Sequence, residues 1–198
     1  MLLIGLTGSV AMGKSTTAAM FAEAGLPVFD ADRTVHELYR GAAAPVVEAA
    51  FPGTTENGVV DRDRLRDRVL GDDAAMARLE ALIHPLVRTE RDRFLREAAA
   101  GGYRAVVLDI PLLFETATEG DVDMVIVVTT SAEIQMARML ARDGMTRERA
   151  EAMIARQVPD PEKRRRAHFL IDTSTSIEDA RRQVGGVLRA VAGMTGRV

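Results

Sequence analysis

Cysteine and tryptophan are both missing from this sequence of 198 residues. Without cysteine, the protein has no thiol nucleophile, no thiolate zinc site and no iron–sulfur cluster. The apolar runs are all shorter than the roughly 20 residues that a membrane-spanning helix needs. The first residues lack the basic stretch and cleavage site of a signal peptide. We therefore expect a cytoplasmic protein with no membrane partner.

Lysine and asparagine are almost as rare. Of the 26 basic residues only Lys14 and Lys163 are lysines, and the single asparagine is Asn57, which a glycine follows. GTP-switch proteins bind guanine through an N-K-x-D motif, which this sequence therefore does not contain. A GTPase of that kind is excluded.

Positive charge is concentrated in one segment. The formal net charge is −3, but residues 138–166 hold nine Lys or Arg and five acidic residues and so carry +4. The acidic total argues against a nucleic-acid partner, whereas this basic segment indicates contact with an anion. Arg138 and Arg142 are four residues apart, which predicts that they share one face of a helix. We expect their guanidinium groups to bind phosphate.

Five short apolar segments predict strands that are buried on both faces. These segments are residues 2–7, 27–30, 104–109, 123–128 and 169–172. Helical stretches separate them, which predicts an α/β fold in three layers with a five-stranded parallel sheet flanked by helices. The carboxyl ends of parallel strands share one edge of the sheet, where ligands bind.

Polar residues mark the starts of several predicted helices. Residues 130–133 have the capping-box pattern Thr-x-x-Glu, and Thr146 is suited to cap the next helix. Asp160 precedes Pro161, and proline is favourable at the first helical position. We therefore predict Asp160 as an N-cap.

The residues from Gly8 to Ser15 match G-x-x-x-x-G-K-[ST] at every fixed position, between a predicted strand and a predicted helix. Backbone N–H groups of such a loop face phosphate. Lys14 would contact the β and γ phosphates, and the Ser15 hydroxyl would bind Mg²⁺. ATP and Mg²⁺ are therefore the expected ligands. The residues predicted to bind ATP are Gly8, Ala11, Met12, Gly13, Lys14, Ser15, Thr16, Arg138 and Arg142.

Two segments interrupt the alternation of strands and helices. Between residues 32 and 101 no buried strand is evident, and Leu and Val recur at helical spacing. The basic segment has the arginine content of a mobile cover over a migrating phosphoryl group. We expect a single P-loop kinase unit over residues 1–198. Its predicted parts are a discontinuous core at 1–35, 102–137 and 167–198, a helical insertion at 36–101, and an arginine-rich lid at 138–166.

Aspartates follow two of the predicted strands. Asp109 closes the third strand and is a candidate for holding the water shell of Mg²⁺, although strand-end aspartates also serve as caps. Asp30 and Asp32 follow the second strand, and their carboxylates share one side if that strand continues. We expect Asp32 to accept or orient the proton of the acceptor hydroxyl. The alternative is that one or both aspartates cap the next helix.

Along nearly its whole length the chain resembles the dephospho-CoA kinase family. The resemblance rests on an ordered set of motifs: the phosphate loop, Asp30 to Asp32, His84-Pro85, Pro111 to Glu115, Gln135, Arg138, Arg142, Gln157, Lys163 and residues 170–172. It implies ATP-dependent phosphorylation of the ribose 3′-hydroxyl of dephospho-CoA, which gives CoA and ADP in the final step of coenzyme A biosynthesis. It also implies a core, a helical acceptor-binding domain and a lid, as in nucleoside monophosphate kinases.

The resemblance further implies roles for single residues. Asp32, Lys14 and Arg142 would be catalytic, with Arg142 a lid arginine over ATP. Ser15 would be a metal ligand, beside Asp109, which is a candidate from its position at the strand end alone. The acceptor would meet Asp32, His84, Pro111, Leu112 and Leu113. Composition alone favours Leu112, Leu113 and Phe114 as core, and a lone helical histidine as structural. Gln135 and Gln157 are interpreted as structural, and Lys163 either reaches phosphate or caps a helix.

The chain departs from the family pattern at several positions. Ser9 and Ala11 stand where the family usually has glycines, and Met12 replaces a serine. Side chains restrict the backbone there, but the fixed residues remain, so we expect retained ATP binding with altered affinity. Thr173 stands where an asparagine is common, which questions adenine recognition if that asparagine contacts the base.

Two other functions remain open from the residues alone. One is a P-loop kinase of another small alcohol or nucleotide, which differs only in its acceptor pocket. The other is a non-catalytic, ATP-dependent regulatory or nucleic-acid-binding module that uses the +4 segment as a basic face. The sequence does not indicate an oligomeric state.

Overall fold

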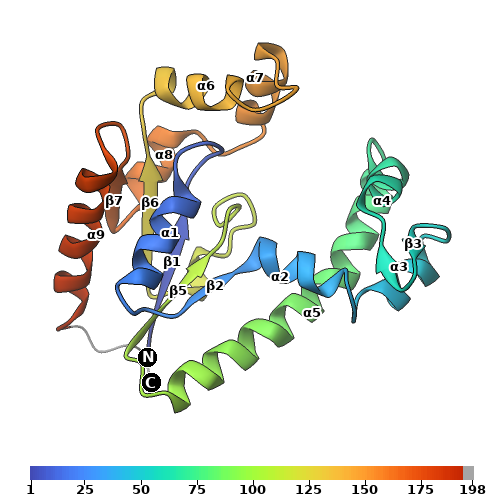
Figure 1. The fold of residues 1–198 in the computed structure, drawn as a ribbon, viewed down its shortest axis with the longest axis horizontal. Coiled ribbons are helices and arrows are strands. Elements are labelled where there is room, and N and C mark those ends of the chain that lie inside the picture. Colours follow the sequence, from blue (N-terminus) through green and yellow to red (C-terminus); the bar gives the residue numbers. More distant parts are fainter. Residues whose placement is uncertain (194–198) are drawn as a thin grey trace. The chain divides into compact units, whose positions relative to one another are not determined.

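A five-stranded sheet organises the first of two units in the computed structural model, which describes residues 1–193. The strand order is β2-β5-β1-β6-β7, and the pairs β1–β5, β1–β6 and β6–β7 are parallel (Figure 1). The strands are β1 (Leu2–Thr7), β2 (Val28–Asp30), β5 (Ala105–Asp109), β6 (Met124–Thr129) and β7 (Phe169–Asp172). The predicted five-stranded parallel sheet is confirmed.

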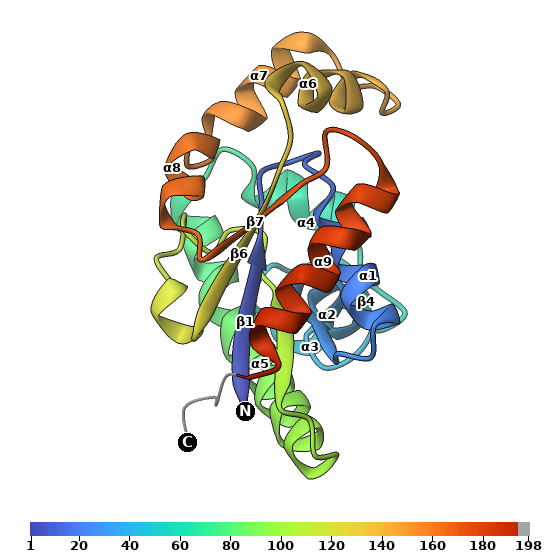
Figure 2. The same ribbon diagram turned by 90° about the vertical axis from the view of Figure 1, so that its left-hand side faces the viewer.

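Helices α1 (Lys14–Glu23), α8 (Asp160–Arg166) and α9 (Ile177–Val191) of the first unit pack against this sheet. Helices α6 (Ala132–Leu140) and α7 (Arg147–Ala155) lie together beyond the ends of its strands (Figure 1). The short 3-10 helix η1 (Glu119–Asp121) precedes β6. Helices α1 and α9 lie side by side, and their apolar faces join the strands in one core (Figure 2). Phe21 of α1, Val184 of α9 and Ile126 of β6 belong to this buried cluster.

Side chains of Ser and Thr cap α6, α7 and α9, and two of the predicted caps change. Ser131, rather than Thr130, is the N-cap of α6 and accepts a hydrogen bond from the Ile134 N–H. Thr146 caps α7 as predicted. The prediction for Asp160 was wrong, because Pro159 is the N-cap of α8. The Asp160 carboxylate instead accepts a hydrogen bond from the Thr129 hydroxyl at 2.8 Å, at the end of β6.

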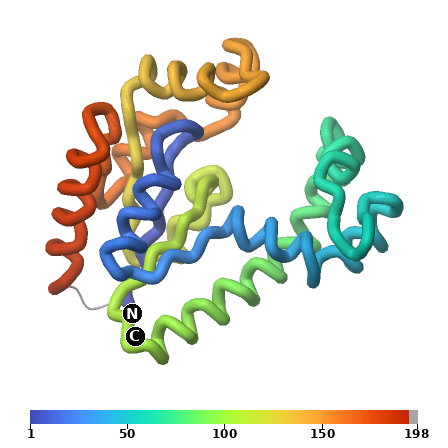
Figure 3. Tube along the Cα trace, viewed as in Figure 1, coloured from blue at the N-terminus to red at the C-terminus, as the bar shows by residue number. Residues whose placement is uncertain are grey.

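The second unit comprises Asp30–Glu97, while the first holds Met1–Phe29 and the chain from Ala98 onward. These bounds differ by a few residues from the predicted insertion at 36–101, and the predicted lid falls inside the first unit. The chain leaves β2, passes through the second unit and returns along α5 (Figure 3). The elements are α2 (Ala31–Leu38), α3 (Ala44–Ala50), β3 (Thr55–Glu56), β4 (Val59–Val60), α4 (Arg62–Val69) and α5 (Asp73–Ala100).

This second unit has a core of its own, which includes Leu38, Val47, Leu65 and Ile83. Its small hairpin, β3 paired antiparallel with β4, was not predicted. Asn57 and Gly58 form the turn, and both have positive φ, 51° and 76°. Asn-Gly is the sequence pair that favours such tight turns, so the signal was present in the sequence. Each strand has only two residues, too few for a period-two apolar pattern to appear.

None of the described helices is both long enough and apolar enough to cross a membrane.

The hairpin generates a stability prediction. Gly58→Ala places a Cβ at φ +76°, with no other atom within 4 Å, so the cost is conformational. We expect the free energy of unfolding, measured with urea, to fall by about 1–2 kcal/mol. Gly41→Ala is the matched control, because Gly41 also has open space around it but no positive φ. The control should be neutral or stabilised by about 0.4–1 kcal/mol. Equal losses in the two variants would contradict this explanation.

Candidate active site

The phosphate loop, residues 8–13, joins the end of β1 to the start of α1 (Figure 1). At Gly8 a Cβ would lie 2.6 Å from the Val128 carbonyl oxygen of β6, so only glycine fits. Gly13 has a φ of +92°, and a Cβ there would lie 3.2 Å from Thr173. The structure thus explains both fixed glycines of the motif, Gly8 by its close approach to β6 and Gly13 by its positive φ together with a tight contact to Thr173.

Lys14 is the first residue of α1, and its ammonium group forms an ion pair with the Asp109 carboxylate. Asp109 ends β5 next to Leu6 of β1 and is only 3% exposed. A buried carboxylate is costly unless it is paired, and Lys14 provides that pairing at the base of the loop. The Lys14 ammonium group is therefore held at the base of the loop, where the loop would bind phosphate.

The predicted metal ligands, Ser15 and Asp109, both belong to the first unit. Ser15 lies exposed in the first turn of α1, together with Thr16. Among residues 1–193 no three His, Asp or Glu side chains gather into a metal cluster. Mg²⁺ in kinases is held by one or two protein groups plus phosphate oxygens and water, and Ser15 and Asp109 fit that donor set.

The structure separates Arg138 and Arg142, which were predicted on one helix face. Helix α6 ends at Leu140 with Ala141 as its C-cap, so Arg142 lies beyond the helix and is exposed. The prediction of one shared face was wrong because the helix stops between the two residues. Arg138 hydrogen-bonds Thr173 at its hydroxyl and carbonyl, at 2.9 and 2.8 Å, and the Ala11 carbonyl at 3.4 Å.

The two aspartates after β2 have different positions. Asp30 is the N-cap of α2 and accepts a hydrogen bond from the Arg33 N–H at 2.9 Å. The strand ends at Asp30, so the arrangement expected for a continuing strand is absent here. Asp32 is exposed in the first turn of α2, in the second unit. Its carboxylate is therefore open to solvent while Asp30 serves as the cap.

His84 also belongs to the second unit. It is exposed in the middle of α5, directly before Pro85. Proline normally interrupts a helix because it lacks an N–H, but α5 continues through it to Ala100. Contact between His84 and the acceptor stays a prediction.

The loop after β5 contains the predicted acceptor wall. Leu112 is 47% exposed, whereas Leu113 is completely buried, beside Gly5 of β1. Leu113 is therefore part of the core, and the prediction that it contacts the acceptor does not fit this structure. Phe114 is buried as well, with the Arg166 guanidinium 4.4 Å from its ring centre. Leu112 and Pro111 retain access to solvent.

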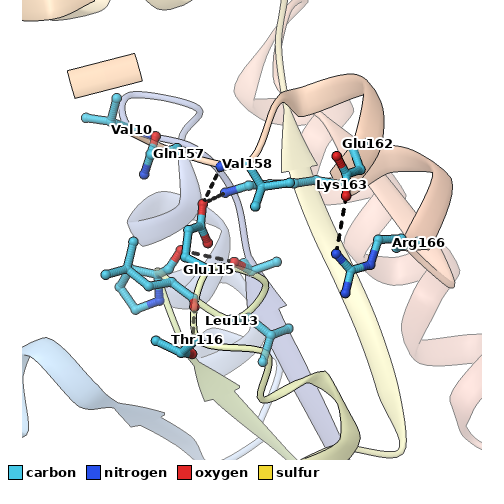
Figure 4. Close-up of polar contacts among 12 residues, drawn as sticks. Val10, Leu113, Glu115, Thr116, Gln157, Val158, Glu162, Lys163 and Arg166 are labelled. Atoms are coloured by element: carbon cyan, nitrogen blue, oxygen red, sulfur yellow. Dashed lines mark hydrogen bonds and ion pairs between the residues drawn. The ribbon is translucent and has the colours of Figure 1, made fainter. Parts of the chain in front are cut away.

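Lys163 makes a buried ion pair with Glu115. Its side chain is 0% exposed, and its Nζ atom lies 2.8 Å from Oε1 of Glu115, which also accepts a hydrogen bond from the Val158 N–H at 2.9 Å (Figure 4). Lys163 thus neither caps a helix nor faces a phosphate group. The pair joins the loop after β5 to α8.

The contacts of Glu115 determine the pKa of its carboxyl group. Burial raises this pKa, but the hydrogen bond from Lys163, those from the backbone N–H groups of Glu115 and Val158, and the positive charge of Lys163 outweigh burial. The pKa therefore lies below its ordinary value. The stabilisation from this carboxylate is complete above the unfolded-state pKa, about 4.3, and is lost as the pH falls through the lower folded-state value.

We predict that the free energy of unfolding of the wild type falls more steeply below about pH 5 than that of Glu115→Gln. Urea unfolding at a series of pH values measures this difference. Glu80→Gln, which removes an exposed helical carboxyl group, is the control and should retain the wild-type dependence. Parallel pH profiles for the wild type and Glu115→Gln would contradict the assignment.

Comparison with known proteins identifies the family to which this chain belongs. The family model described as dephospho-CoA kinase matches residues 2–179. A dephospho-CoA kinase of Rhodopseudomonas palustris is 56% identical over 197 residues, which cover 100% of this chain and 99% of that protein. A crystal structure of a Thermus thermophilus protein superposes with a TM-score of 0.82 at 35% identity, covering 97% of this chain and 98% of the other.

A second solved structure, a dephospho-CoA kinase from Campylobacter jejuni, superposes with a TM-score of 0.67 at 25% identity, and 96% of each chain is covered. A shikimate kinase from Acinetobacter baumannii, 18% identical with a TM-score of 0.56 over 97% of this chain and 93% of that one, shares the fold. Because the family model spans most of the sequence and its relatives match over their full length, this chain belongs to the dephospho-CoA kinase family.

Proposed function

We propose that this protein transfers the γ-phosphoryl group of ATP to the ribose 3′-hydroxyl of dephospho-CoA, giving CoA and ADP. The observation that carries the proposal is the phosphate loop, in which Gly8 is sterically required, Gly13 has a positive φ, and the Lys14 ammonium is held by buried Asp109. Such a loop binds a nucleoside triphosphate. Membership of the family supplies the acceptor.

ATP fits the residues of the loop. Backbone N–H groups at the start of α1 favour an anion because the helix dipole places partial positive charge there. Lys14 adds a full positive charge beside them, and Arg138 of α6 contacts the same loop at the Ala11 carbonyl. Mg²⁺, which Ser15 and Asp109 would hold through its ligand shell, supplies charge neutralisation for the phosphate oxygens.

The proposed transfer needs a group that accepts one proton. The bond from the γ phosphorus to the bridging oxygen of ADP breaks, a bond from the ribose oxygen to that phosphorus forms, and the hydroxyl proton leaves. We assign the proton to the exposed carboxylate of Asp32. Arg142, exposed beyond α6, is the arginine proposed to stabilise the transferred charge. Pro111, Leu112 and His84 are proposed to contact the acceptor.

The cytoplasmic location and the lack of a nucleic-acid partner remain predictions. Neither rival function has a specific observation in its favour, so each is an outcome of the experiment below.

We expect the purified protein, given ATP, Mg²⁺ and dephospho-CoA, to form CoA and ADP in equal amounts, as measured by chromatography of both products. A panel of other nucleosides and small alcohols tests the rival kinase. Turnover of a panel member at higher kcat/KM than dephospho-CoA would replace the acceptor assignment. ATP binding without phosphorylation of any acceptor, together with salt-sensitive binding of nucleic acid, would support the non-catalytic alternative.

Replacement of Asp32 tests the catalytic base. Asp32→Asn removes the proton acceptor and should lower kcat by roughly 100-fold or more, while the Kd for ATP should change little. Asp30→Asn is the matched control two residues away, because asparagine caps a helix as well as aspartate does. The control should keep near wild-type kcat. An Asp32→Asn variant with wild-type turnover would show that another group accepts the proton.

A further inference from the structure

The phosphate loop is hydrogen-bonded from outside by side chains that are distant in the sequence. The carbonyl of Val10 accepts from Nε2 of Gln135 at 2.8 Å, and the carbonyl of Met12 accepts from the Thr173 hydroxyl at 2.8 Å. Gln135 lies on α6 and is only 5% exposed, and Thr173 directly follows β7. A buried amide of this kind is expected to be hydrogen-bonded, and here its partner is the loop.

Gln157 holds the other polar group of Val10. Its Oε1 atom accepts a hydrogen bond from the Val10 N–H at 2.9 Å (Figure 4). Gln157 lies in the connection between α7 and α8, 147 positions from Val10. Two glutamines therefore fix both the N–H and the C=O of one loop residue, which defines the orientation of its peptide planes.

Ala11, the next residue, has a backbone conformation that needs such support. Its φ is +61°, in the left-handed region that residues with a Cβ disfavour. A non-glycine residue stays there only where surrounding contacts determine it. The contacts on Val10 and Met12 lie on both sides of Ala11, and the Arg138 guanidinium reaches the Ala11 carbonyl itself at 3.4 Å.

Thr173 supports the loop in a second way. A Cβ at Gly13 would lie 3.2 Å from Thr173, so this side chain packs directly on the end of the loop. Its backbone N–H donates to the Thr129 carbonyl at 2.9 Å, which fixes Thr173 to the end of β6. Its hydroxyl oxygen accepts from Arg138 at 2.9 Å. The hydroxyl has the Met12 carbonyl as its nearer acceptor at 2.8 Å and the Thr129 carbonyl as a second one at 3.3 Å.

We propose that Gln135, Gln157 and Thr173 are positioning residues for nucleotide binding. Together, as the loop clasp, they hold the backbone from Val10 to Gly13 in the form that receives phosphate, without touching the nucleotide. With the clasp intact, the loop is already ordered before ATP binds. The affinity for ATP is therefore higher, because no binding free energy is used to order the loop. The inference rests on the proposed function, because it assumes that the loop binds ATP.

The central test compares two substitutions of Thr173. Thr173→Val keeps the branched shape and removes the hydroxyl, whereas Thr173→Ser keeps the hydroxyl. A neutral hydrogen bond contributes an amount that corresponds to roughly a five- to tenfold change in an equilibrium constant. We expect Thr173→Val to raise the Kd for ATP, measured by calorimetry with Mg²⁺, about five- to tenfold. Thr173→Ser should remain within about twofold of the wild type.

Gln157→Ala gives an independent measurement, and Gln183→Ala is its matched control. Gln183 also hydrogen-bonds both polar groups of one residue, the N–H and C=O of Asp172 at 2.8 and 2.9 Å, but that residue lies outside the loop. We expect Gln157→Ala to raise the Kd and the KM for ATP several-fold with kcat at saturating ATP nearly unchanged. Gln183→Ala should leave both constants unchanged, even if it lowers the thermal unfolding midpoint equally.

The outcomes separate this inference from the proposed function. A wild type that binds and uses ATP, with Thr173→Val and Gln157→Ala folded and equal to it in affinity, would overturn the loop clasp alone. A Thr173→Ser variant that loses as much ATP affinity as Thr173→Val would also overturn the loop clasp. A wild type that does not bind ATP would overturn the proposed function and the clasp together.

Discussion

The position of β1 between β5 and β6 is the constraint on which the active site depends. Because the three strands are parallel and fully paired, their carboxyl ends meet at one edge of the sheet. The phosphate loop leaves β1 there, Asp109 ends β5 there, and the Val128 carbonyl of β6 approaches Gly8 so closely that no side chain fits between them. The buried strands thus position both a carboxylate for Lys14 and a wall for the loop. Because such a loop is tightly packed, its backbone N–H groups are already ordered before the ligand binds, and binding needs no further ordering free energy.

The sheet could be predicted because its strands are buried on both faces and therefore read as continuous apolar runs. All five predicted segments lie within a residue or two of the observed strands. The hairpin at Asn57 was not predicted because strands of two residues are too short to show a periodic apolar pattern. The start of α8 was misplaced by one residue because the Asp160 carboxylate is used by Thr129, a residue from another part of the chain. Tertiary contacts of that type have no local signature.

The site could be predicted where the motif itself fixes the chemistry, as at Gly8, Gly13 and Lys14. It could not be predicted where a side chain acts at long range. Nothing in the sequence next to Gln157 or Lys163 indicates their partners, because Val10 and Glu115 lie far away in the chain. Composition alone favoured Leu112, Leu113 and Phe114 as core residues, which is confirmed for Leu113 and Phe114 and wrong for Leu112, which is 47% exposed.

The protein holds its phosphate loop in place before the nucleotide arrives. Residue-resolved hydrogen exchange of the nucleotide-free protein, followed by NMR, tests this at the Val10 N–H, which donates to Oε1 of Gln157. We expect this N–H to exchange much more slowly than in an unstructured peptide, and to lose that protection in Gln157→Ala. Exchange at the unstructured rate until ATP is added would show instead that the loop forms only around its ligand.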